Sequence, residues 1–103
     1  MKLVIIESPF AGNTAENIEY ARKCVLDSLN RGESPIASHL VYTQVLDDTD
    51  LKQRTQGITA GIAWYKVADL CAVYTDKDIT PGMQQGIEMA AAHKIKVEYR
   101  SIF

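Results

Sequence analysis

The amino-acid sequence predicts a small α/β domain: a three-layer sandwich with a four-stranded parallel sheet, in the order 2-1-3-4, covered by helices on both faces. Short apolar segments alternate with helical patterns along the chain, which favours strand-helix-strand crossovers. Residues 70–74 form a continuous apolar run, typical of a strand buried on both faces of a parallel sheet. The 103 residues, 47% of them hydrophobic, predict one domain spanning residues 1–103.

The first half of the chain predicts two strands and one helix. Residues 2–7 are an apolar run that ends in Glu7, and a turn-rich loop follows at residues 8–13. Asn13 is placed to cap a helix, with Glu16 completing a capping box, and the helical periodicity continues to Gly32. Residues 36–38 are a short apolar strand, and the polar stretch that follows, with its aspartates near residue 48, is expected to be irregular.

The second half predicts two helices and two strands. Asp50 can cap a helix that ends near Val67 and whose apolar face is formed by Ile58, Ile62, Trp64 and Tyr65. Residues 70–74 are the third strand, a polar loop follows, and Pro81 suits the first turn of a helix that runs to about His93. Residues 96–100 are the final strand. This alternation is that of Rossmann-like and flavodoxin-like sheets.

Composition and charge exclude several classes of protein. The net charge is −2, and the 11 Lys and Arg are scattered among 13 Asp and Glu, so we expect no long nucleic-acid partner. The apolar runs are too short to span a membrane, and the start of the chain lacks the pattern of a secretion signal, so we expect a cytoplasmic protein. Cys24 and Cys71 lack the spacing of a redox or zinc pair, and we expect no metal and no cofactor.

In parallel sheets, ligands bind beyond the carboxyl ends of the strands. The loops after the first and third strands each lead into a helix N-terminus, where backbone N–H groups favour an anion. Gly, Ser and Asn are also ordinary turn residues, so each loop alone has a purely structural explanation. The ligand-binding residues predicted from these loops are Ser8, Pro9, Phe10, Gly12, Asn13, Asp76, Pro81, Gly82 and Met83.

The segment after the second strand adds a second group of candidates. His39 and Tyr42 combine a titratable ring with an aromatic face, which suits a base or a ribose, although a lone His is often a satisfied structural residue. Arg54 is able to clamp a phosphate, or it is simply solvated. Trp64 and Tyr65 are interpreted as core packing.

The chain resembles the nucleoside 2-deoxyribosyltransferase-like family, which includes small phage and prophage domains and the related SLOG nucleotide-sensing domains. The resemblance covers nearly the whole sequence. It is carried by three short stretches: VIIESPF at residues 4–10, WYKVAD at residues 64–69 and PGM at residues 81–83. It implies a nucleotide-binding fold and a homo-oligomer, for which we expect a homodimer.

The resemblance also implies where catalytic acids belong. Family enzymes attack the sugar with a glutamate on the helix after the third strand, and that position is Gly86 in this chain. A second family acid falls on Gly61. Glu88 lies two residues beyond Gly86, and two helical steps rotate a side chain by about 200°, so we expect it to point away from the site. Restoring Glu at position 86 is expected to restore traces of activity.

Two functions follow from these observations. The first is non-catalytic binding of a nucleoside, a nucleotide or a nucleotide-derived signal. In this interpretation the chain is expected to act as a phage-encoded protein that captures such a signal. The second is an N-glycosidase or deoxyribosyltransferase with relocated acids, for which the candidate catalytic residues are Glu7, Asp76 and Glu88. A small interaction protein that binds no small molecule is a third interpretation.

Overall fold

The computed structural model describes all 103 residues, Met1–Phe103. The strands are β1 (Leu3–Glu7), β2 (Ser34–Ile36), β3 (Leu70–Tyr74) and β4 (Lys96–Arg100). The α-helices are α1 (Thr14–Asn30), α2 (Ser38–Val41), α3 (Leu51–Ala63) and α4 (Pro81–Ala92), and the short 3-10 helices are η1 (Tyr42–Gln44) and η2 (Trp64–Lys66). No helix combines the length and the hydrophobicity that a membrane crossing requires.

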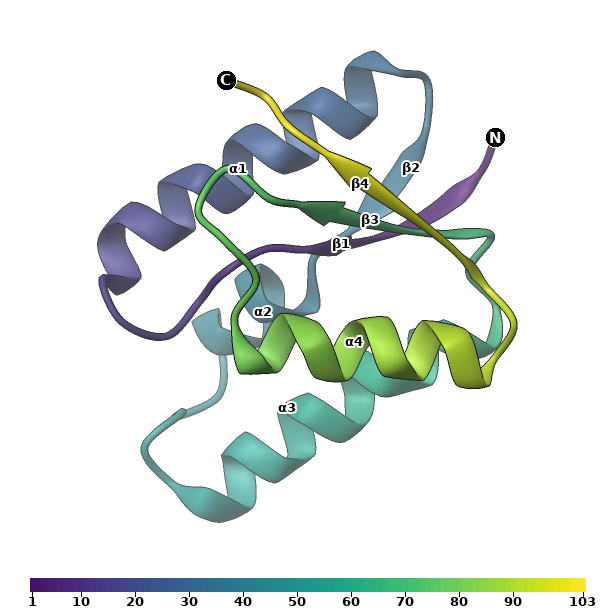
Figure 1. Ribbon diagram of the computed structural model, residues 1–103. Coiled ribbons are helices and arrows are strands. Elements are labelled where there is room, and N and C mark those ends of the chain that lie inside the picture. The colour runs from purple at the N-terminus through teal and green to yellow at the C-terminus, as the bar shows by residue number, and fades with distance from the viewer.

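The four strands form one parallel sheet in the order β2-β1-β3-β4, which confirms the predicted architecture. In the register of the central pair, Val4 lies opposite Leu70 and Glu7 lies opposite Val73. Helix α1 covers one face of the sheet and α4 covers the other, with α3 beyond α4 (Figure 1). The carboxyl ends of β1 and β3 therefore open toward the loops that precede α1 and α4.

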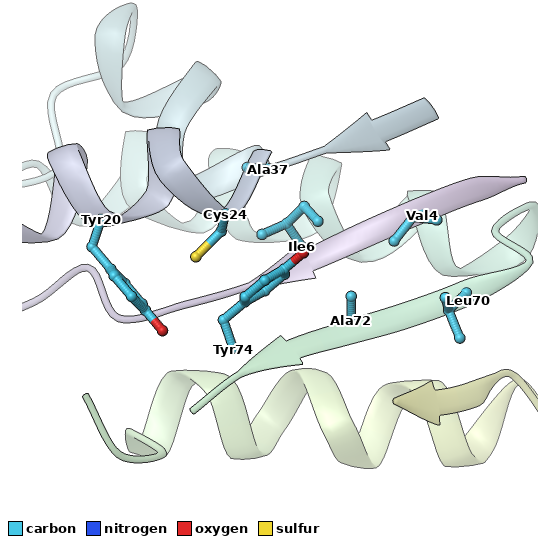
Figure 2. Packing of buried hydrophobic residues seen from close by; sticks show 8 residues of the cluster. All are labelled: Val4, Ile6, Tyr20, Cys24, Ala37, Leu70, Ala72 and Tyr74. Atoms are coloured by element: carbon cyan, nitrogen blue, oxygen red, sulfur yellow. The ribbon is translucent and has the colours of Figure 1, made fainter. Parts of the chain in front are cut away.

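Side chains alternate between two hydrophobic cores, one on each face of the sheet. The core under α1 contains Val4, Ile6, Tyr20, Cys24, Ala37, Leu70, Ala72 and Tyr74 (Figure 2). The core under α4 contains Ile5, Tyr65, Cys71, Val73, Met83 and Ala90. Because successive residues of a strand point to opposite faces, β1 and β3 supply both cores, and these strands are the apolar runs of the sequence.

The predicted second strand is placed two residues too late. Strand β2 is Ser34–Ile36, and Ser38 already begins α2. Pro35 lies within this strand, which is possible because β2 is at the edge of the sheet and an edge strand tolerates the missing N–H. The predicted irregular stretch accordingly contains α2 and η1 before the turn that precedes α3.

Helix caps agree in part with the prediction. Asn13 caps α1, and its Oδ1 accepts the backbone N–H of Glu16 at 3.3 Å. The expected capping box at α1 is wrong, because the Glu16 carboxylate lies 3.7 Å from the Lys77 ammonium and makes no bond back to Asn13. Asp50 occupies the N-cap position of α3 without a side-chain hydrogen bond. At α4 the cap is Thr80, whose hydroxyl accepts the N–H of Met83 at 3.2 Å.

Helix α3 stands away from the sheet. It packs against α2 and η2, and Ile58 and Ile62 remain 49% and 38% exposed, so they do not form the buried face that the sequence predicts. Both isoleucines line the cavity described below. The glycines of α3 lie against the preceding segment: a Cβ at Gly61 would lie 2.6 Å from Ser38 Oγ, and one at Gly57 would lie 3.2 Å from Leu46 Cδ1. The glycines therefore allow α3 to approach α2 closely.

Candidate functional site

A cavity of about 720 Å³ opens at the carboxyl ends of the strands, between the end of β1, the α2–η1 segment, α3 and α4. Its volume lies in the range typical of small-molecule sites. Helix α3 packs against α2, and residues of α3 and α4 both line the cavity. The predicted site residues that line it are Glu7, Ser8, Phe10, His39, Tyr42, Arg54, Pro81, Gly82, Met83 and Glu88.

Glu7 is the acid at the floor of this cavity, at the last position of β1. The hydroxyl of Tyr65 donates a hydrogen bond to its Oε2 at 2.6 Å. Burial raises the pKa of Glu7 to about 7, against the opposing effect of that hydrogen bond. The Glu7 carboxyl therefore changes protonation near neutral pH, which is where an acid or base catalyst works best.

Gly86 leaves the space that the Glu7 carboxyl occupies. A Cβ built at position 86 would lie 2.5 Å from Glu7 Cδ, closer still to Glu7 Oε2, and 2.7 Å from the Tyr65 hydroxyl. No side chain fits at position 86 unless this pair moves. The region of α4 where the resemblance implies a glutamate therefore faces a carboxyl group supplied by β1.

The Glu7→Gln variant is expected to gain on the order of 2 kcal/mol in free energy of unfolding at pH 8 and to change little at pH 4. The folded protein holds a proton on Glu7 up to a pKa of about 7, whereas the model value for an unperturbed Glu is 4.5. The free energy of unfolding of the native protein is therefore not reduced by Glu7 below about pH 4.5, where the carboxyl is protonated in both states. It falls as the pH rises toward 7, because ionisation of Glu7 favours the unfolded state. Urea denaturation at both pH values measures this, with Glu19→Gln on the exposed face of α1 as the control. An equal effect of Glu7→Gln at both pH values would contradict the raised pKa.

Ser8 and His39 form a second polar pair in the cavity. Ser8 Oγ and His39 Nε2 are 2.7 Å apart, and Ser8 is buried. Burial lowers the pKa of His39 to about 4, so its ring is neutral at pH 7. The pair joins the loop after β1 to α2, and it offers hydroxyl and imidazole groups to a ligand without adding charge.

Three further predicted residues that line the cavity, Tyr42, Arg54 and Met83, differ in their exposure and in their hydrogen bonds. Tyr42 accepts a hydrogen bond from Trp64 Nε1 at 2.8 Å, which holds the phenol ring beside α3. Arg54 lies on the exposed first turn of α3, and no hydrogen bond or ion pair of its side chain is present. Met83 is only 1% exposed and belongs mainly to the core under α4.

Four predicted ligand-binding residues do not line the cavity: Pro9, Gly12, Asn13 and Asp76. Pro9 is buried, Gly12 adopts a φ of +99° in the turn, and Asn13 caps α1. Of the two helix N-termini, only that of α4 lines the cavity, so the two do not converge on it as the sequence analysis expects.

Asp76 has a structural role on the other face of the sheet. Its carboxylate accepts hydrogen bonds from the Tyr20 hydroxyl at 2.6 Å, from Ser101 Oγ at 2.6 Å and from the backbone N–H groups of Ile102 and Phe103. These hydrogen bonds hold the pKa of Asp76 below its ordinary value, despite the opposing effect of burial. Asp76 thus anchors the end of the chain against α1.

The expectation that Glu88 points away from the site is wrong. Glu88 lines the cavity together with Gln85, Met89 and Ala92, on the side of α4 toward α3. Gly86 faces Glu7 and Tyr65 at the floor and also lines the cavity, so the cavity extends around two sides of α4.

The sequence analysis missed Tyr65 and the wall formed by α3. Tyr65 was interpreted as core packing, and its ring is indeed 4% exposed, but its hydroxyl reaches Glu7. The signal for the wall was present in Gly57 and Gly61, whose spacing of four residues places both on one side of a helix and allows close packing. No group of three or more His, Cys, Asp or Glu side chains is arranged to hold a metal ion.

A parallel sheet in the order β2-β1-β3-β4, with a cavity at the carboxyl ends of its strands, defines a doubly wound α/β domain with a small-molecule cavity. The chain belongs to the family described as Domain of unknown function (DUF7768), whose model matches residues 2–100. A comparison with curated proteins finds no match.

Solved structures share this fold at low sequence identity. The 2-deoxyribosyltransferase of Bacillus psychrosaccharolyticus has a TM-score of 0.71 at 15% identity, over 96% of this chain and 72% of that chain. The 2-desoxiribosyltransferase of Leishmania mexicana has a TM-score of 0.68 at 14% identity, over 98% of this chain and 65% of that chain. The CMP N-glycosidase BcmB of Clostridium botulinum has a TM-score of 0.54 at 18% identity, over 97% of this chain and 69% of that chain. The chain therefore has a deoxyribosyltransferase-like fold and spans about two thirds of these proteins.

Proposed function

We propose that the cavity binds a nucleoside or a nucleotide. The observation that carries this proposal is the cavity itself, which lies between the end of β1 and the start of α4. In open α/β sheets this edge is where ligands bind. Proteins of similar fold are named for acting on deoxyribosyl groups and on CMP, which supports a ligand of this class.

The lining of the cavity suits the two parts of such a ligand. The apolar side chains of Phe10, Tyr42 and Met89 offer surface to a flat base. The carboxyl of Glu7 and the Ser8–His39 pair offer hydrogen bonds to sugar hydroxyls. The ligand therefore meets a polar floor and apolar walls, as small-molecule sites generally provide.

A second function, cleavage of an N-glycosidic bond, is favoured by one observation. The Glu7 carboxyl occupies the space left by Gly86, is held by the Tyr65 hydroxyl, and has its pKa raised to about 7. A carboxylate there is able to attack the anomeric carbon of a bound sugar. The carbon–oxygen bond forms as the carbon–nitrogen bond breaks, and the bonding electron pair goes to the base, which takes a proton from solvent water. A second water then hydrolyses the glycosyl ester, which releases the sugar and regenerates the Glu7 carboxylate.

Two measurements test these functions separately. Calorimetric titration with nucleosides and nucleotides tests binding, and saturable binding with one ligand per chain is expected. Chromatography of deoxynucleosides incubated with concentrated protein tests cleavage through the release of free base. Binding without base release assigns the non-catalytic function, whereas base release that is lost in Glu7→Gln assigns the glycosidase function to Glu7.

Asp76→Asn is the matched control for the cleavage assay. Asp76 lies outside the cavity, and its carboxylate accepts a hydrogen bond from Ser101 near the end of the chain. Asp76→Asn is therefore expected to lower the free energy of unfolding. Any base release is expected to persist at temperatures where the variant is folded. Base release that depends on Asp76 or on Glu88 rather than on Glu7 would contradict the assignment. The absence of binding for every nucleoside and nucleotide would contradict the proposed function as a whole.

The homodimer stays a prediction that follows from the sequence resemblance and from the small size of the domain. Light scattering at micromolar concentration is expected to give twice the mass of the 11.5 kDa chain. The mass of a single chain would contradict the prediction.

A further inference from the structure

Strand β2, at one edge of the sheet, is protected against pairing with a further strand. It is only three residues long, and the N–H of Ser34 bonds to the Lys2 carbonyl at 2.8 Å, on the side of β1. The backbone groups of successive residues in a strand point to alternate sides, so Pro35 occupies the position that faces outward. Because proline has no N–H, this edge offers no outward donor, which is a common protection against edge-to-edge pairing.

Strand β4, at the other edge, lacks this protection (Figure 1). It is five residues long and contains no proline. The Arg100 carbonyl accepts the N–H of Thr75 at 2.9 Å, on the side of β3, so the same alternation turns the N–H and C=O groups of Val97 and Tyr99 outward. Neither of these N–H groups bonds to a loop or a helix, and Tyr99 is 58% exposed. The outer side of β4 is therefore open.

The side chains of β4 divide between the two faces of the sheet. Val97 and Tyr99 lie on one face, and Lys96, Glu98 and Arg100 lie on the other. Lys96 is exposed and forms no ion pair within the chain. Glu98 Oε2 lies 2.6 Å from Arg100 Nη2, whereas Glu98 Oε1 has no partner. The open edge thus carries an unpaired ammonium and a free carboxylate oxygen on the same face, two residues apart.

We infer that β4 pairs with β4 of a second copy of the chain, antiparallel and with Val97 opposite the partner's Val97, so that two four-stranded sheets join into one. In this register Lys96 lies opposite the partner's Glu98, and Glu98 opposite the partner's Lys96. The outward backbone groups of the two Val97 residues bond to each other. On the other face Tyr99 lies opposite Ile95, whose carbonyl accepts the Tyr99 N–H. The inference names the surface of a homodimer and does not depend on the ligand of the cavity.

The other central registers of this pairing leave the charges unmatched. Side chains directly opposite each other must point to the same face, so the two-fold axis passes through a residue of β4. An axis at Glu98 places two glutamates opposite each other and Lys96 opposite Arg100, and both pairs repel. An axis at Tyr99 places Glu98 opposite an Arg100 guanidinium that is already held within its own chain. The axis at Val97 gives both unpaired groups a partner of opposite charge.

Charge variants of β4 test the register by sedimentation equilibrium of the whole chain at micromolar concentrations. Lys96→Glu and Glu98→Lys are each expected to raise the dimer dissociation constant about tenfold, because two attractive pairs become repulsive. An equimolar mixture of the two variants is expected to recover the dimer, since opposite charges face each other again. Lys52→Glu on the exposed side of α3 makes the same change of net charge and is expected to change the constant by no more than about twofold.

Tyr99→Pro and Tyr99→Ala test the backbone pairing. Both remove the exposed phenol ring, but only Tyr99→Pro also removes the outward N–H, and an edge strand tolerates this loss within one chain. Tyr99→Pro is therefore expected to be monomeric and folded by circular dichroism, whereas Tyr99→Ala is expected to dimerise. If Tyr99→Pro does not fold, the charge variants decide.

Two results overturn the inference. The first is a native chain that stays monomeric across the concentration range. The second is a dimer that Lys96→Glu weakens no more than Lys52→Glu does, or that persists in folded Tyr99→Pro. The second result would leave the homodimer standing and place its interface on another surface. Neither result bears on ligand binding in the cavity, so the proposed function is tested independently.

Discussion

Gly86→Glu is expected to abolish ligand binding and to lower the free energy of unfolding by about 1–3 kcal/mol, the usual cost of overpacking. The Cβ alone would lie 2.7 Å from the Tyr65 hydroxyl and within contact distance of the Glu7 carboxyl. The added carboxylate would meet that of Glu7 in the same space, so one of the two must move into the cavity or stay protonated. We therefore expect that the variant does not restore the arrangement that the resemblance implies, and this replaces the trace of activity expected from the sequence alone.

The matched comparison for this prediction is Gly86→Ala against Gly82→Ala. A Cβ at Gly82 meets nothing nearer than Thr80 Oγ1 at 3.9 Å. In a helix, replacing Gly by Ala normally stabilises by about 1 kcal/mol, so Gly82→Ala is expected to be neutral or stabilising and Gly86→Ala destabilising. Urea denaturation and calorimetric titration measure both properties. Gly86→Glu with full stability and undiminished binding would show that Glu7 and Tyr65 are free to move.

Arg100→Ala is expected to lower the free energy of unfolding by about 3–5 kcal/mol, a large part of the stability of a domain of this size. Arg100 is 5% exposed, and its guanidinium donates to both carboxylate oxygens of Glu33, at 2.8 and 2.7 Å, and to the Tyr74 hydroxyl at 3.2 Å. Its removal leaves the Glu33 carboxylate partly buried without a cation. Thermal and urea denaturation measure the loss.

The control for Arg100 is Arg22→Ala. Arg22 pairs with Glu19 at 3.3 Å, but both side chains are about two thirds exposed, at 66% and 65%, so the loss is expected to stay below about 1 kcal/mol. The pH dependence gives a second check. The Arg100 guanidinium lowers the pKa of Glu33, so this contribution is present at neutral pH and is lost as the pH falls through the lowered pKa. Arg100→Ala is therefore expected to lower the free energy of unfolding less at pH 3 than at pH 7. An equal loss at the two pH values would contradict the ion-pair explanation.

Much of the fold was predictable because its signals are local. The bounds of β3 and β4 agree with the prediction residue for residue, since each is an apolar or alternating run between polar loops. Asn13 caps α1 as expected because capping involves residues three apart in the sequence. The error at β2 has a local cause as well: Ile36 is the last residue of an edge strand and Ala37 is already the N-cap of α2, and no local signal marks where α2 begins.

The sequence by itself determined the alternation of strands and helices, and with it the edge of the sheet where Ser8, His39 and Tyr42 line one cavity. Only the tertiary structure decided what the floor of that cavity is. Glu7 and Tyr65 are 58 residues apart in the chain, and their hydrogen bond exists only because Gly86 of a third element leaves room for it. Each of these residues alone has an ordinary interpretation: the end of a strand, a core aromatic, a helix glycine. Contacts between distant segments depend on how whole side chains fill a shared volume, and no local pattern encodes that.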